Sequence, residues 1–216
     1  MIDYGTREND LMTETLAEVS HEHINDYLAG VQTALATVSP AQVAAIVEVL
    51  LDAAQTGKMI FICGNGGSAS TASHMACDLG KGCRMPGFPS FKAIALTDSM
   101  SQVTAWANDT SYENCFSGQL EGLASPGDVL VSISGSGNSP NVLKAVEVAK
   151  TLGMTTIGWS GFKGGKLAGM VDYGIVTPAS NIETVEDLHM ILEHTVSTTL
   201  RRTIQARTGQ YSEGGC

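Results

Sequence analysis

The sequence predicts an α/β fold in which helices cover both faces of a parallel sheet. Three features indicate this: an all-helical first quarter, an alternation of short apolar runs with helix-compatible stretches from Lys58 onward, and glycine-rich loops that directly follow two of the apolar runs. Strands that alternate with helices in this way form parallel sheets, which bind ligands at the carboxyl ends of their strands. We therefore expect the two loops to share a cleft at that end.

Residues 1–57 are expected to form an N-terminal helical arm. A moderately amphipathic helix is predicted over 11–37, and a second helix begins after Ser39, which suits the N-cap before Pro40. Gln42 completes the pattern of a capping box, and Gly57 ends the helix. An arm of this kind is more often used in subunit association than in chemistry.

Residues 58–205 form the predicted α/β core. Its five strands are the apolar runs 59–63, 91–96, 128–133, 154–159 and 173–176. Its helices are expected near 69–81, 99–106, 111–122, 139–152 and 183–205. Residues 206–216 are predicted to be a frayed tail, so the chain of 216 residues makes one domain.

Composition excludes several functions. The net charge of −10 argues against a nucleic-acid partner, because a polyanion needs a basic surface and the chain has only 12 Lys and Arg residues. The charged N-terminus and the lack of a long apolar run predict no signal peptide, no membrane span and a cytoplasmic location. The five cysteines include no CxxC pair, which favours buried, reduced thiols.

The loop after the strand 128–133 has the composition of a phosphate site. It reads SGSGNS, with the hydroxyls of Ser134, Ser136 and Ser139 around Gly135 and Gly137. Glycines let the backbone approach an anion, hydroxyls donate hydrogen bonds, and the next helix directs its positive N-terminal end at the ligand. Neither a P-loop nor a Gly-x-Gly-x-x-Gly pattern is present, so we expect a monophosphate.

A second loop of this kind, CGNGGS, spans 63–68. One such loop is weak evidence because ordinary turns use the same residues, but two loops at strand ends favour a shared cleft. The following helix carries His74 and Asp78, four residues apart on one face. They are either a surface pair or an imidazole and a carboxylate over the ligand, suited to proton abstraction or metal binding.

The final helix carries a third polar group. On a helical wheel Glu183, Glu186 and His194 share one side, opposite an apolar stripe. His189 lies away from them and is predicted to make a structural hydrogen bond. Glu186 and His194 are about 12 Å apart along the axis, so their side chains converge only on a ligand between them. The alternative is a solvated acidic face.

Residues 97–112 contain Asp98, Asn108 and Asp109, which are types that bind hydroxyl groups. Asp98 is equally suited to cap the helix that follows it. Trp106 is predicted to belong to the core rather than to a stacking platform.

Together these motifs resemble those of the sugar isomerase (SIS) domain family, and in particular its phosphoheptose isomerases. The resemblance rests on the order CGNGGS, the His74–Asp78 helix, Ala-Asn-Asp at 107–109, ISGSGNS, GxxGGKLA at 161–168 and a final VEDLH…EH helix. It implies a doubly wound, flavodoxin-like sheet and a homotetramer with active sites at subunit contacts.

The resemblance also implies the roles of individual residues. The implied sugar-phosphate ligands are Asn65, Gly66, Gly67, Ser68, Asn108, Asp109, Ser134, Gly135, Ser136, Ser139 and Glu186. The implied zinc ligands are His74, Asp78, Glu186 and His194. Asp78 is the implied base and His194 the implied acid in the isomerisation of a ketose phosphate to an aldose phosphate through an enediolate. The implied substrate is sedoheptulose 7-phosphate and the product D-glycero-D-manno-heptose 7-phosphate.

Three positions depart from the family pattern. Asp78 replaces a Glu, which shortens its reach by one methylene, and Glu186 replaces a Gln, which adds a negative charge. Gly82 occupies the place of a basic residue, with Lys81 beside it. These changes either strengthen a divalent metal site or mark a different sugar phosphate.

Two other functions stay open at this stage. One is a non-catalytic SIS protein that binds a sugar phosphate or a replication-initiation protein, and the other is an isomerase of another sugar phosphate. Retention of His74 and His194, each with a carboxylate on its helix face, favours an enzyme, because a binding protein needs only the serine loop.

Overall fold

The computed structural model describes the backbone of residues 5–209 and the side chains of residues 18–209. Its strands are β1 (Met59–Cys63), β2 (Lys92–Ala95), β3 (Val129–Ser134), β4 (Thr155–Gly161) and β5 (Tyr173–Thr177). They form one sheet in the order β2-β1-β3-β4-β5, and every neighbouring pair is parallel. The predicted five-stranded, doubly wound sheet is therefore confirmed.

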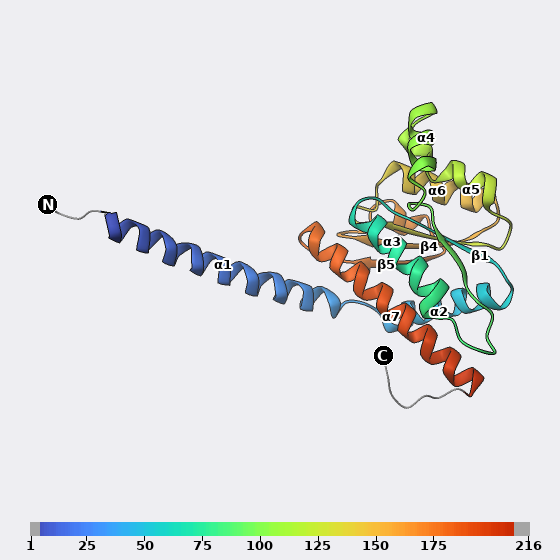
Figure 1. Ribbon diagram of the computed structural model, residues 1–216, viewed down its shortest axis with the longest axis horizontal. Coiled ribbons are helices and arrows are strands. Elements are labelled where there is room, and N and C mark those ends of the chain that lie inside the picture. The colour runs from blue at the N-terminus through green and yellow to red at the C-terminus, as the bar shows by residue number, and fades with distance from the viewer. Residues whose placement is uncertain (1–4, 210–216) are drawn as a thin grey trace.

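Helices cover both faces of this sheet (Figure 1). The helices are α1 (Gly5–Leu35), α2 (Pro40–Gln55), α3 (Gly67–Cys77), α4 (Met100–Asp109), α5 (Ser117–Leu123), α6 (Pro140–Thr151) and α7 (Ile182–Thr208). Ile60 and Ile62 of β1 pack in the core on the side of α2, α3 and α7. Phe61 and Cys63 pack with α5 and α6 on the other side. The inner strands β1, β3 and β4 are buried on both faces, which explains why they read as continuous apolar runs, whereas Lys92 and Ile94 of the edge strand β2 are exposed.

The strand order places both predicted loops at one point. β1 and β3 are neighbours, with Cys63 opposite Ser132, and the chain winds outward from this pair to β2 on one side and to β4 and β5 on the other. In such sheets the binding crevice opens outside the carboxyl ends of the strands where the winding reverses. CGNGGS follows β1 and SGSGNS follows β3, so the two loops leave the sheet side by side.

The predicted start of α2 is confirmed, but the predicted capping box is wrong. Ser39 is the N-cap, and its hydroxyl accepts a hydrogen bond from the backbone N–H of Gln42 at 3.5 Å. The Gln42 side chain does not turn back to Ser39; it donates to the carbonyl of Gly174 in β5 at 3.2 Å. A long-range partner has replaced the local one, and it ties α2 to the edge of the sheet.

α1 projects from the α/β body as a long arm (Figure 1). Between residues 18 and 35 its apolar side chains Val19, Ile24 and Leu28 are exposed. Near its end Tyr27 donates to the Asp187 carboxylate of α7 at 2.6 Å. No single helix among the described residues is long and apolar enough to cross a membrane; the bent pair Glu18–Leu35 and Pro40–Gln55 meets that test only when both helices are taken together.

Two further expectations are refined by the structure. Of the cysteines, Cys63, Cys83 and Cys115 are buried free thiols as predicted, whereas Cys77 is exposed because it lies on the open side of α3. Cys216 lies outside the described residues. α7 continues to Thr208, past its predicted end, and the predicted tail beyond Gly209 also lies outside the described residues.

Candidate active site

The serine loop gathers hydroxyls at the end of β3. The hydroxyls of Ser134 and Ser139 lie 3.0 Å apart, and Ser139 is the N-cap of α6. Ser136 is exposed, and its hydroxyl accepts a hydrogen bond from the backbone N–H of Asn138 at 3.1 Å. All three hydroxyls therefore lie between the end of β3 and the positive N-terminal end of α6, as an anion site requires.

The GxxGGKLA segment, residues 161–168, is hydrogen-bonded to the backbone of this loop. Gly161 and Leu167 donate backbone hydrogen bonds to the carbonyls of Gly135 at 2.9 Å and Gly137 at 3.0 Å. A side chain on Gly137, whose φ is +64°, would collide with the carbonyl oxygen of Gly164. The segment that contributed to the family resemblance thus fixes the backbone of the serine loop.

Two asparagines join the loops. Asn65 and Asn141 exchange two amide hydrogen bonds, each 2.9 Å long, and Tyr112 also donates to the Asn65 oxygen at 2.9 Å. Asn141 is buried and further donates to the sulfur of Cys115. Sequence reasoning found Asn65 but missed Asn141 and Tyr112, because a reciprocal amide pair across neighbouring strands leaves no local pattern.

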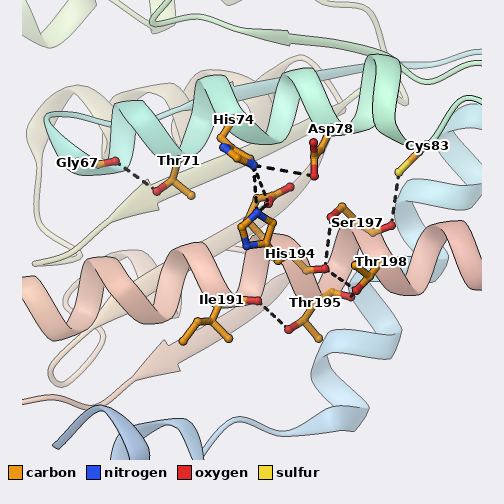
Figure 2. A network of polar contacts seen from close by, with 11 residues as sticks. Gly67, Thr71, His74, Asp78, Cys83, Ile191, His194, Thr195, Ser197 and Thr198 are labelled. Carbon is orange, nitrogen blue, oxygen red and sulfur yellow. Dashed lines mark hydrogen bonds and ion pairs between the residues drawn. The ribbon is translucent and has the colours of Figure 1, made fainter. Parts of the chain in front are cut away.

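The two predicted histidines meet between α3 and α7 (Figure 2). Their Nε2 atoms lie 3.1 Å apart, and the rings are nearly perpendicular. Asp78 lies one turn further along the same stretch of helix, with a carboxylate oxygen 4.0 Å from the His74 Nε2 atom (Figure 2). Asp78 opens a π-helical turn (Asp78–Gly82), a feature that occurs often at functional sites.

The fourth member of this cluster is Glu193, which sequence reasoning missed. One Glu193 carboxylate oxygen lies 3.8 Å from the His74 Nε2 atom and 3.6 Å from the His194 Nε2 atom. Glu193 is fully buried, and neither of its oxygens has a hydrogen-bond partner among the described residues. Burial, and to a smaller extent the Asp78 carboxylate, raises the pKa of Glu193 to about 7. The Arg201 guanidinium acts in the opposite direction.

A signal for Glu193 was present in the sequence. It follows Glu186 by seven residues, nearly two helical turns, so the two share one face of α7. Glu193 thus falls on the polar side of the helix, where it is expected to be one more solvated carboxylate. Its burial depends on the packing of α3 against α7, which the sequence does not display.

Glu186 lies outside the cluster of His74, Asp78, Glu193 and His194. Its carboxylate occupies the space beside Gly67, where a side chain on Gly67 would collide with it. The pairs Gly67–Glu186 and His74–His194 advance together along the two helices, so α3 and α7 run parallel here. Glu186 is therefore about two turns nearer the start of both helices than the histidines, facing the CGNGGS loop.

The other predicted residues divide into two groups. Gly66 is the N-cap of α3 with φ +55°, and Ser68 is buried in the first turn of that helix. Asn108 and Asp109 end α4, where both are exposed and Asn108 donates to Asp109 at 2.8 Å. Among the described residues, no hydrogen bond joins that pair to either of the two loops.

Gly82, the third position that departs from the family pattern, lies next to Arg201 of α7. A side chain on Gly82 would lie 3.5 Å from a guanidinium nitrogen of Arg201 and 3.3 Å from a carboxylate oxygen of Asp78. Arg201 thus brings a positive charge to the end of the π-turn. Asp98 does not cap α4 as predicted, since it accepts a hydrogen bond from Ser73 and Ser99 is the N-cap.

His189 is a structural residue, as predicted. It is fully buried, and its Nε2 atom lies 3.3 Å from the Thr177 hydroxyl. Burial lowers the pKa of His189 from 6.5 to about 4. Between these pH values the unfolded chain binds a proton at this position and the folded chain does not, so the free energy of unfolding falls as pH falls through the window.

We expect His189→Gln to remove this acid sensitivity. Between pH 6.5 and 4 the wild type should lose ~3 kcal/mol more of its free energy of unfolding than the variant does. Urea unfolding at a series of pH values measures the difference. Parallel curves for the two proteins would show that His189 is not the group that titrates.

Comparison with known proteins identifies the family. A family model of the SIS domain matches residues 24–161. The chain belongs to the SIS domain family. The curated phosphoheptose isomerase of Geotalea daltonii is 46% identical to it over 155 residues, which cover 71% of this chain and 79% of that protein. The phosphoheptose isomerase of Trichlorobacter lovleyi is 41% identical over 175 residues, or 80% of this chain and 87% of that protein.

Solved structures agree. The phosphoheptose isomerase from Neisseria gonorrhoeae matches this SIS domain with a TM-score of 0.78 at 32% identity, covering 87% of this chain and 99% of that one. The phosphoheptose isomerase from Francisella tularensis matches with a TM-score of 0.76 at 29% identity, covering 85% and 98%. The resemblance seen in the motifs is confirmed.

The cluster in this SIS domain fits a divalent metal. Imidazole nitrogens and carboxylate oxygens are the ligands that zinc takes in proteins. The ligand atoms of His74, Asp78, Glu193 and His194 all lie within 4.8 Å of one another. The buried Glu193 oxygens, which lack hydrogen-bond partners, are what such an ion would satisfy.

Proposed function

We propose that this protein is a phosphoheptose isomerase that converts sedoheptulose 7-phosphate to D-glycero-D-manno-heptose 7-phosphate. The observation that carries the proposal is the pairing of His74 and His194, with Asp78 beside them, close to two phosphate-type loops at one switch point. The high similarity to phosphoheptose isomerases over most of the chain supports the same reaction.

The loops hold the substrate. Ser134, Ser136 and Ser139 donate hydrogen bonds to the phosphate at the start of α6. The CGNGGS loop contacts the sugar through Asn65, Gly66, Gly67 and Ser68, with Gly135, Glu186, Asn108 and Asp109 completing the proposed contacts. Asn65 is held in place by Asn141 and Tyr112, so the sugar end and the phosphate end of the cleft keep a fixed spacing.

The reaction needs a base and an acid but no oxidant. Asp78 removes a proton from C1 of the open-chain ketose, which gives an enediolate, and His194 protonates C2. The proton of the C1 hydroxyl passes to the oxygen on C2, so that C1 becomes the aldehyde and C2 carries a hydroxyl. Backbone amides of the loops stabilise the negative oxygen. A zinc ion held by His74, Asp78 and His194 would supply further stabilisation of that charge, and the proton transfers would then fall to the second oxygen of Asp78 and the second ring nitrogen of His194.

Assembly and location follow the same proposal. The chain acts as one SIS domain in a cytoplasmic homotetramer whose sites lie at subunit contacts. The exposed apolar side chains of α1 and the exposed pair Asn108 and Asp109 supply surfaces for such contacts.

The direct test is product analysis. Purified protein is incubated with sedoheptulose 7-phosphate, with and without a chelator, and the sugar phosphates are separated and identified. We expect the aldose heptose phosphate as product and slower conversion with chelator present. Parallel incubations with pentulose and hexulose phosphates serve as controls, and faster turnover of one of these would overturn the choice of substrate.

A further inference from the structure

Glu193 is a buried carboxyl group without an adequate partner. Its side chain is 0% exposed, and both its oxygens lack hydrogen-bond partners among the described residues. One of these oxygens lies 3.8 Å and 3.6 Å from the Nε2 atoms of two imidazoles that also face each other. A buried carboxylate is strongly destabilising unless it is paired or coordinates a metal. The position of Glu193 therefore calls for a cation between it and the histidines.

We propose that Glu193 is a ligand of the bound metal, and that the complete set is His74, Asp78, Glu193 and His194. This inference rests on the proposed function only in assuming that the site is loaded with metal. It replaces Glu186, the ligand that the family pattern implies, with a residue two turns further along α7.

The distances suit four-coordinate zinc. Zinc bonds of about 2.0–2.1 Å in a tetrahedron place the ligand atoms about 3.3 Å apart. The separations here are 3.1 Å between the two Nε2 atoms, 3.6 Å and 3.8 Å from these atoms to Glu193, and 4.0 Å from His74 to Asp78. The remaining separations, from Asp78 to Glu193 and to His194, are within 4.8 Å, so Asp78 has to move furthest to reach that spacing.

Charge supports the same set. Two imidazoles and two carboxylates bring two negative charges to a dication, so the loaded site is neutral. The Arg201 guanidinium, which borders the π-turn, offsets part of the carboxylate charge when the metal is absent.

Glu186 is placed for a different task. Its carboxylate lies against Gly67 in the first turn of α3, where the positive end of the helix attracts a negative group. From there it faces the CGNGGS loop, which is proposed to contact the sugar. Its distance along the helix from His194, about 12 Å, keeps it away from the imidazoles.

Zinc affinity separates the two glutamates. Glu193→Gln and the control Glu186→Ala are titrated with zinc against a chromophoric chelator. Alanine is used at position 186 because a glutamine there is the ligand that the family pattern implies. We expect Glu193→Gln to bind zinc at least about tenfold more weakly than the wild type. We expect Glu186→Ala to bind zinc as the wild type does.

Two further measurements distinguish the loss of a metal ligand from a defect in folding. In excess chelator, Glu193→Gln should unfold at a temperature no lower than the wild type, because the change removes an unpaired buried charge, and zinc should raise this temperature less than it does in the wild type. Glu193→Asp keeps the charge with a shorter reach and should bind zinc with intermediate affinity.

The outcomes are separable from those of the isomerase test, because no sugar is present. A wild type that binds no zinc, Glu193 variants with wild-type affinity, or an equal loss in Glu186→Ala would each overturn the inference. Failure to isomerise sedoheptulose 7-phosphate with zinc affinities as expected would overturn the substrate and leave the ligand set standing.

Discussion

Asp78→Asn is expected to abolish isomerisation while sugar-phosphate binding persists. An amide cannot accept the proton from C1, and loss of a positioned general base costs about 10²- to 10⁴-fold in rate. The serine loop lies at the end of β3 and is untouched by the change, so the phosphate still binds. Steady-state kinetics at saturating zinc gives kcat, and calorimetric titration with the sugar phosphate gives Kd.

Two variants serve as controls for this result. Asp52→Asn makes the same change at an exposed position of α2 and should leave kcat unchanged. Asp78→Glu restores a carboxylate with a longer reach and should retain measurable turnover. The zinc content of Asp78→Asn is measured as well, because Asp78 is also a proposed ligand. Full activity in Asp78→Asn would remove its assignment as the base.

The second large effect is expected from Ser134→Ala combined with Ser139→Ala. The two hydroxyls lie 3.0 Å apart and are proposed to donate to the same phosphate. A hydrogen bond to a charged group contributes about 1.5–3 kcal/mol, so loss of both should raise KM by about a hundredfold or more. The proton-transfer groups are unchanged, so kcat should fall much less than in Asp78→Asn.

Ser125→Ala is the matched control for the serine pair. Ser125 is exposed and lies just before β3, at the opposite end of the strand from the loop. The KM of the Ser125→Ala variant should therefore equal that of the wild type. Thermal unfolding of the double variant checks that the loop still folds. An unchanged KM in the double variant would place the phosphate elsewhere.

The fold was predictable because its signals are local. The inner strands β1, β3 and β4 are buried on both faces, so each appears as a short apolar run, and the loops after β1 and β3 carry glycines that their turns require. The start of α2 was likewise predictable from Ser39 and Pro40. The contact of the Gln42 side chain was not predictable, because its partner, Gly174, is 132 residues away.

The site was predictable only in part, for the same reason. His74, Asp78 and His194 belong to motifs and the structure brings them together. Glu193 and Asn141 owe their positions to contacts between segments far apart in the chain, Glu193 to α3 and Asn141 to the CGNGGS loop. A buried polar side chain of this kind differs in no local way from a solvated one.

The parallel packing of α3 and α7 has a consequence for biosynthesis. Residues 74–78 and 193–194 supply the four clustered side chains, and four strands and three α-helices lie between them in the chain. A truncated or still-emerging polypeptide that lacks α7 has only His74 and Asp78 of these four side chains, however complete its sheet. Catalytic turnover is therefore expected only after α7 has packed against α3.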